Sequence, residues 1–239
     1  MAKETFHRKI EGLWIVFTVL TVASILVGTA VELVPMFLIK SNIPTIQSVK
    51  PYTPLELAGR DLYIREGCNN CHSQMVRPFR DELERYGEYS KPGESVYDHP
   101  FLWGSKRTGP DLARVGGKYP NLWHVRHMED PRSTSPKSIM PPYAWLLSYQ
   151  LDLSTLQARM KTLRTLGVPY SDAEINNALI AANKQAKEIA DDVAANGGPK
   201  NLQDKEIVAM VAFLQRLGKD IKAQPTAQNA STTTANGGS

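Results

Sequence analysis

The chain has 239 residues, which is enough for one ordinary domain with appendages or for two small domains. It carries 28 Lys and Arg against 24 Asp and Glu, and this slight positive excess is spread along the chain without a basic block, so we expect no nucleic-acid partner. Two cysteines in all are too few for a disulfide framework.

The first predicted element is an apolar helix within residues 1–40. Residues 12–31 contain no charge and are rich in Leu, Ile, Val and Phe, which is about the length needed to cross a bilayer as a helix. A buried core helix and a cleaved signal peptide are the alternatives, and Gly28-Thr29-Ala30 is small enough for a cleavage site. Because the apolar stretch is too long for a signal peptide and resumes after this site, we predict one uncleaved transmembrane anchor in contact with membrane lipid.

Charges around this helix predict its orientation. Lys3, Arg8 and Lys9 precede it, and the positive-inside rule places that end in the cytoplasm. Everything after Lys40 would then lie outside. Glu32, near the outer end, lies either at the membrane interface or beside a neighbouring subunit, and we favour the interface.

Three segments follow the anchor. Residues 41–51 contain Pro44 and Pro51 and show no helical period, so they predict an extended tether. Residues 52–222 form the predicted external domain. The tail, residues 223–239, consists mostly of Thr, Ala, Asn, Gly and Ser, and it predicts disorder because it is too polar and simple to pack.

The domain begins and ends with a predicted helix. Thr53-Pro54-Leu55-Glu56 provides an N-cap, a first-position proline and a capping box for a helix that runs to about Glu66. In residues 204–217 apolar residues recur at helical spacing before Gly218. Gly59 in the first helix either lets this second helix cross closely or is a tolerated accident.

A C-x-x-C-H motif, Cys68-Asn69-Asn70-Cys71-His72, follows the first helix and is the attachment signature of a c-type haem. Two thiols at this spacing can each add across one vinyl group of the same porphyrin, and the adjacent imidazole then ligates the iron. A zinc site would need more ligands, a thioredoxin-like pair would need a βαβ pattern, and a disulfide would not explain the histidine. We therefore predict one covalent haem c on Cys68 and Cys71, with His72 as an axial ligand.

This order of elements resembles the class I cytochromes c, in which a helix before C-x-x-C-H is crossed by one near the end of the domain. The resemblance implies an all-α fold. Thr108-Gly109-Pro110-Asp111-Leu112 resembles the cytochrome c loop whose proline carbonyl orients the ligating imidazole, which implies this role for Pro110 toward His72.

We predict Met140, in Ser138-Ile139-Met140-Pro141-Pro142, as the second axial ligand. A thioether needs no deprotonation, and the two prolines stiffen the loop that presents it. His/Met ligation would raise the reduction potential. The alternatives are Met128 or a bis-histidine iron with His99, His124 or His127.

The remainder of the domain is less regular. Residues 77–142 are rich in Pro, Gly and aromatics with little helical pattern, and such a long insertion is usually functional. Two further helices are predicted, one from a capping box at Ser154-Thr155-Leu156-Gln157 to Gly167, and one from Ser171-Asp172-Ala173-Glu174 to about Asn196. They either pack within the domain or offer a face to another subunit.

A denser resemblance covers about residues 51–145 and becomes thinner from 146 to 218. It is carried by Arg60-Asp61, Cys71-His72-Ser73-Gln74-Met75-Val76-Arg77-Pro78-Phe79-Arg80, Arg85-Tyr86-Gly87, Tyr97-Asp98-His99-Pro100, Trp103-Gly104-Ser105-Lys106-Arg107-Thr108-Gly109-Pro110-Asp111-Leu112, Pro131-Arg132 and Ser138-Ile139-Met140-Pro141. In these motifs the chain resembles the mono-haem c subunit (subunit II) of cbb3-type cytochrome c oxidases.

The resemblance implies a non-catalytic electron-transfer subunit in the bacterial inner membrane, with a periplasmic haem domain. Its haem would receive electrons from a di-haem cytochrome c subunit and pass them to the haem b of the catalytic haem-copper subunit of a proton-pumping, oxygen-reducing complex. Residues 77–106 would form a docking surface. Arg77, Arg80 and Arg107 would stabilise haem propionates or pair with acidic groups of a partner.

Two other functions remain open on the residues alone. A free-standing, membrane-anchored electron shuttle needs the same haem but a mobile linker and an uncluttered haem edge. A haem-based gas sensor, from another class, needs an open or labile sixth position on the iron.

Overall fold

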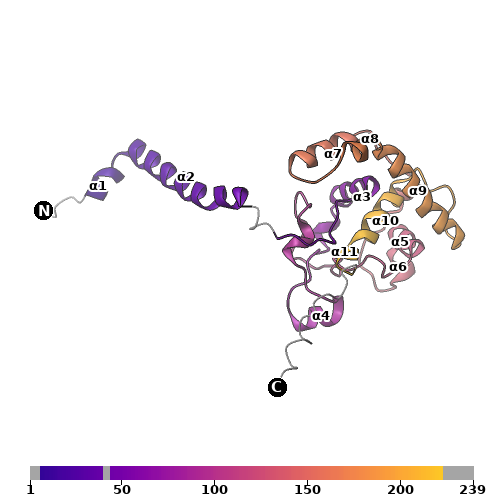
Figure 1. Ribbon diagram of the computed structural model, residues 1–239. Coiled ribbons are helices and arrows are strands. Elements are labelled where there is room, and N and C mark those ends of the chain that lie inside the picture. Colours follow the sequence, from indigo (N-terminus) through magenta and orange to yellow (C-terminus); the bar gives the residue numbers. More distant parts are fainter. Residues whose placement is uncertain (1–5, 40–43, 223–239) are drawn as a thin grey trace, which may run out of the picture. The chain divides into compact units, whose positions relative to one another are not determined.

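The computed structural model describes residues 6–39 and 44–222. They divide into two units, an N-terminal helical unit and a domain that begins at Thr45 (Figure 1). Within these residues the structure contains helices and no strand, and one antiparallel bridge joins Gln150 to Lys205. The predicted tail 223–239, tether residues 41–43, and Lys3 and Lys40 of the predicted anchor lie outside the described residues.

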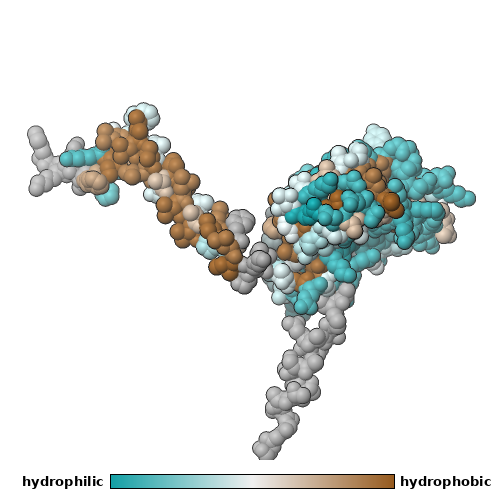
Figure 2. All heavy atoms as spheres, turned by 45° about the horizontal axis from the view of Figure 1, so that its top comes forward, coloured by the Kyte–Doolittle hydropathy of each residue, from teal (hydrophilic) through white to brown (hydrophobic). Residues whose placement is uncertain are grey.

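The N-terminal unit consists of α1 (Phe6–Glu11) and α2 (Trp14–Leu38). The segment Trp14–Met36 is long and apolar enough to cross a membrane, and its side chains are exposed. Figure 2 shows this apolar surface in brown. At about 1.5 Å per residue, the 25 residues of α2 exceed the hydrocarbon thickness of about 30 Å. Glu32 lies in the last third of α2, which continues past the uncharged run 12–31 and ends within the predicted anchor, residues 1–40.

The domain is organised around a close crossing of two helices, α3 (Pro54–Arg65) and α10 (Glu206–Arg216). The predicted capping box at the start of α3 is confirmed, because Thr53 Oγ1 accepts from the Glu56 amide and Glu56 Oε2 accepts from the Thr53 amide. A Cβ on Gly59 would lie 1.8 Å from the carbonyl oxygen of Ala209. Gly59 is therefore required by the crossing and is not an accident.

The core lies around α10. Its residues 206–214 are all buried, and the ring of Phe213 packs against Tyr63 at 5.2 Å and against Tyr52 at 5.8 Å between centroids. Helix α9 (Ala178–Ala195) lies against both α3 and α10. Its buried face consists largely of alanines four residues apart, whose small side chains allow close approach: Ala178, Ala182, Ala186 and Ala190.

The capping box predicted at Ser154 is wrong. Helix α7 (Leu156–Thr165) has Thr155 as its N-cap, in the right-handed helical region and without a side-chain capping bond. The Ser154 amide instead donates to Asp152 Oδ1, so this carboxylate holds the turn. The capping box at Ser171 is confirmed, but the helix that follows is interrupted at Asn177 and forms α8 (Asp172–Asn176) and α9.

The insertion is irregular over most of its length but holds short helices that the sequence did not predict: α4 (Arg80–Tyr86), η3 (Pro92–Ser95), α5 (Asn121–Glu129) and α6 (Pro131–Thr134). Both α4 and α5 begin without a side-chain capping bond, after Phe79 and Pro120 respectively. The usual start signal is therefore missing. In Figure 1, α4 lies apart from the other helices of the domain.

The first and last described segments of the domain meet. The Lys50 amide donates to Asp220 Oδ2 in α11 (Lys219–Lys222) at 3.0 Å, and Arg216 donates to the Lys50 carbonyl at 2.7 Å. Residues 45–51 are therefore tied to the C-terminal end of the same domain.

Candidate functional site

The C-x-x-C-H motif forms a tight turn directly after α3. Gly67, with φ of 70°, reverses the chain at the end of the helix, and the 3-10 turn η2 (Cys68–Asn70) follows. The Cys68 carbonyl accepts from the amides of Cys71 and His72 at 3.2 and 2.9 Å. Both cysteines are free thiols, with Cys68 buried and Cys71 exposed. Burial, reinforced by the Glu66 carboxylate, raises the pKa of Cys68 to about 12, so its thiol is neutral at pH 7.

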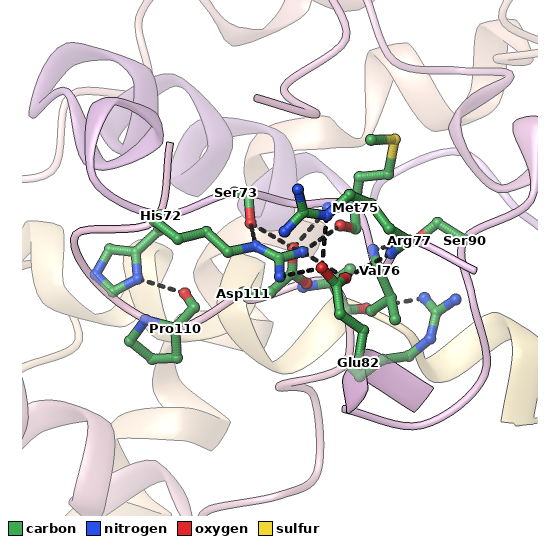
Figure 3. Close-up of polar contacts among 12 residues, drawn as sticks. His72, Ser73, Met75, Val76, Arg77, Glu82, Ser90, Pro110 and Asp111 are labelled. Carbon is green, nitrogen blue, oxygen red and sulfur yellow. Dashed lines mark hydrogen bonds and ion pairs between the residues drawn. The ribbon is translucent and has the colours of Figure 1, made fainter. Parts of the chain in front are cut away.

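The ring of His72 is held by the loop that contains Pro110. His72 Nδ1 lies 2.8 Å from the Pro110 carbonyl oxygen, so Nδ1 carries the proton and Nε2 keeps its lone pair (Figure 3). A Cβ on Gly109 would lie 2.3 Å from His72 Cε1, so only glycine fits beside the ring. Burial lowers the pKa of His72, which favours the neutral imidazole that a metal requires.

Met140 lies on a loop that packs over the core. Its side chain is partly buried against the main cluster. The Tyr143 amide, three residues on, donates to the Met128 carbonyl at 2.7 Å and so joins this loop to α5. Burial, and then the nearby Cys68 and Cys71, raise the pKa of Tyr143. The role of Met140 as a ligand stays a prediction.

The three alternative histidines occupy different surroundings. His124 is buried, meets Trp123 edge to face at 5.4 Å, and its Nε2 finds no hydrogen-bond partner within the described parts of the chain. Burial lowers the pKa of His124 to about 4. His127 stacks on Trp123 at 4.5 Å, and its Nδ1 lies 2.6 Å from Thr134 Oγ1. The carbonyl of His99 accepts from Arg60 at 3.3 Å.

The arginines predicted beside the haem have acidic partners within the chain. Arg77 and Arg107 both bind the carboxylate of Glu82, and Arg80 pairs with Glu84 at the surface. Their expected contacts with propionates or with a partner subunit stay predictions.

Asp111 is a site residue to which the sequence assigned no role. It is buried, and Oδ2 accepts from Ser73 Oγ at 2.6 Å and from the Met75 amide at 2.8 Å. Its other oxygen accepts from the Ala113 amide at 2.9 Å. Asp111 therefore joins the segment after His72 to the loop of Pro110. The position of Asp111 directly after Pro110 is the sequence feature that could have indicated this role.

These residues fit a covalently bound haem. Two free thiols lie in one turn, an imidazole with an unused Nε2 follows them, and Gly109 leaves room for the imidazole ring. The thioether of Met140 lies on a loop that packs against the core of the same domain.

Together, the crossing of α3 and α10 around a C-x-x-C-H turn and the apolar helix α2 define a class I cytochrome c domain with a single N-terminal anchor helix. Residues 7–221 match the family described as "Cytochrome C oxidase, mono-heme subunit/FixO". The chain belongs to this family and is the mono-haem, electron-transfer subunit of a cbb3-type cytochrome c oxidase, which it forms with other subunits. No curated protein matches the chain.

Proposed function

We propose that the chain binds one haem c through thioether bonds to Cys68 and Cys71, with His72 and Met140 as the axial ligands of its iron. The observation that carries this proposal is the hydrogen bond from His72 Nδ1 to the Pro110 carbonyl. It fixes the tautomer in which Nε2 is available to iron, in a turn that also holds both thiols.

The bound haem would supply one-electron redox chemistry, and the residues around it would set its properties. The Pro110 carbonyl accepts a hydrogen bond from His72 Nδ1–H and so makes the imidazole a stronger electron donor to iron. Gly109 leaves the space that the His72 ring occupies, since a Cβ there would lie 2.3 Å from His72 Cε1. Met140 as the second ligand would favour the reduced iron and raise the potential.

We further propose the electron route and the orientation. The chain would act as the relay between a di-haem cytochrome c subunit and the haem b of the catalytic haem-copper subunit, and the haem held by Cys68, Cys71, His72 and Met140 would supply the one-electron chemistry. Arg8 and Lys9 precede α2, so the positive-inside rule places the N-terminus in the cytoplasm and the domain, residues 52–222, in the periplasm of a bacterial inner membrane. Residues 41–51 would link the membrane anchor to the periplasmic domain, and residues 223–239 would be a disordered tail.

Acid-acetone extraction tests the covalent link. The wild-type chain should keep its colour in the polypeptide and show the spectrum of haem c after treatment with pyridine. The double variant Cys68→Ala/Cys71→Ala should lose covalent haem, whereas Ser148→Ala, which removes an exposed hydroxyl, should keep it. Complete extraction of the haem from the wild-type chain would refute the proposal.

Rapid mixing of the whole complex with a reductant specific for the di-haem subunit tests the route. Haem b should be reduced in the wild-type complex. In a complex that retains the Cys68→Ala/Cys71→Ala chain, its reduction should slow by orders of magnitude. An unchanged rate of haem b reduction would show that electrons bypass this subunit. If the wild-type chain purified in mild detergent without haem b and copper, the result would favour a free-standing electron shuttle.

A further inference from the structure

Glu82 is a buried carboxylate on the otherwise isolated helix α4. Only 3 % of the residue is exposed. Its carboxylate accepts from Arg107 at 2.6 and 2.7 Å, from Arg77 Nε at 2.5 Å and from the Arg77 amide at 2.7 Å. One carboxylate thus faces two guanidinium groups, one from the start of the insertion and one from near its middle.

Arg107 uses its remaining donors on the segment after the C-x-x-C-H motif. Its Nε donates to Ser73 Oγ at 2.7 Å, and a terminal nitrogen donates to the Met75 carbonyl at 2.9 Å. Arg107 is mostly buried, with 17 % of its side chain exposed. Because the Glu82 carboxylate orients the guanidinium, loss of this partner would leave a largely desolvated charge without its main acceptor.

The two segments that Arg107 joins are the ones that carry His72 and Pro110. They run side by side, because the Gly109 amide donates to the Cys71 carbonyl at 2.9 Å and the Leu112 amide donates to the Ser73 carbonyl at 3.0 Å. Figure 3 shows His72 and Pro110 on the left, with Glu82 to their right within the polar network that also includes Ser73 and Asp111. A change in how Arg107 is held would therefore be transmitted along the short connection from Ser73 to His72.

We infer that Glu82 is a positioning residue, which through Arg107 holds the two segments in register and thereby sets the strength of the hydrogen bond at His72 Nδ1. The inference rests on the proposed ligation of iron by His72. A looser bond at Nδ1 makes the imidazole a weaker electron donor, which would raise the reduction potential of the haem. The effect would reach the iron without any contact between Glu82 and the haem.

The experiment compares the full-length chain in detergent with Glu82→Gln and Glu82→Asp. The readouts are the solvent exchange rate of the His72 Nδ1 proton in the reduced, histidine-labelled protein, and the reduction potential. The chain has only five histidines, which makes assignment practical. Glu84→Gln is the matched control, because it removes the same charge from the same helix at an exposed side chain that pairs with Arg80 at the surface.

Glu82→Gln should keep covalent haem, speed the exchange of the Nδ1 proton by about tenfold and raise the potential, whereas Glu84→Gln should do neither. Glu82→Asp keeps the charge but withdraws the carboxylate by roughly 1.5 Å, the length of one carbon–carbon bond. Positioning predicts a faster exchange in Glu82→Asp too, whereas a purely electrostatic effect predicts wild-type exchange.

Three results would overturn the inference: unchanged exchange in Glu82→Gln, wild-type exchange in Glu82→Asp, or equal changes in the Glu84→Gln control. A wild-type chain without covalent haem would instead refute the proposed function. If Glu82→Gln did not fold, Glu82→Asp alone would decide between the two explanations.

Discussion

Gly59→Ala should destabilise the domain, because the crossing of α3 and α10 has no room for a methyl group. The new Cβ would lie 1.8 Å from the Ala209 carbonyl oxygen, 2.6 Å from its carbonyl carbon and 2.9 Å from Phe213 Cβ. Ordinary contact begins at 3.4 Å, so the methyl would be about 1.6 Å too close to the oxygen, the difference between 3.4 and 1.8 Å. The nearest atoms belong to backbone, which cannot rotate away, so the helices must separate.

The size of the effect follows from two opposing terms. Overpacking of a core costs about 1–3 kcal/mol, and the upper end applies because the obstacle is backbone. Alanine stabilises a helix interior by about 1 kcal/mol relative to glycine. The free energy of unfolding should therefore fall by about 2 kcal/mol, and Tm should fall by about 4–8 °C for a domain of this size.

Thermal unfolding of the haem-loaded chain in detergent measures this change. Gly28→Ala in α2 is the control, because a Cβ there would meet nothing within 4 Å. Truncation of the facing side chain by Ala209→Gly should not restore the Tm of Gly59→Ala, since the clash is with the carbonyl group. A Tm of Gly59→Ala equal to or above the wild-type value would refute the reasoning.

Two further predictions concern the site. Met140→His should retain covalent haem but lower its reduction potential, since histidine stabilises oxidised iron better than a thioether does; redox titration with an unchanged potential would remove Met140 from the coordination sphere. Hydrogen bonds from Arg107 and Arg77 hold the pKa of Glu82 at about 2, below its usual value of 4.5. Its contribution to stability is thus fully present above about pH 4.5 and is lost as the pH falls toward 2. Urea unfolding between pH 7 and 3 should therefore show a smaller loss of stability in Glu82→Gln than in the wild type, and parallel curves would contradict this.

The sequence predicts well those features of the fold that depend on residues close together in the chain. The capping boxes at Thr53 and Ser171 each join residues three apart, so their signals are complete within four letters of sequence. The box at Ser154 fails because Asp152, two residues earlier, captures the Ser154 amide instead. The same local pattern thus has two outcomes, decided by one competing carboxylate.

In the candidate site, too, local features are predictable from the sequence, whereas contacts between distant residues are not. The motif from Cys68 to His72 is local, and its turn is recognisable from spacing alone. The partnership of Glu82 with Arg107 spans 25 residues and joins an uncapped helix to a loop. From the sequence these arginines are predicted to contact haem propionates or a partner subunit. No periodicity in the sequence indicates which carboxylate of the chain each arginine binds.

The hydrogen bonds between Lys50 and both Asp220 and Arg216 decide at which residue a truncated chain without the anchor helix should begin. A version that began at residue 52 would deprive Asp220 of its backbone donor and Arg216 of an acceptor carbonyl. One that begins at Thr45 keeps both. Since Lys50 is bonded to both Asp220 and Arg216, the two ends of the domain meet at one place, and a cut at either end has to respect contacts made by the other.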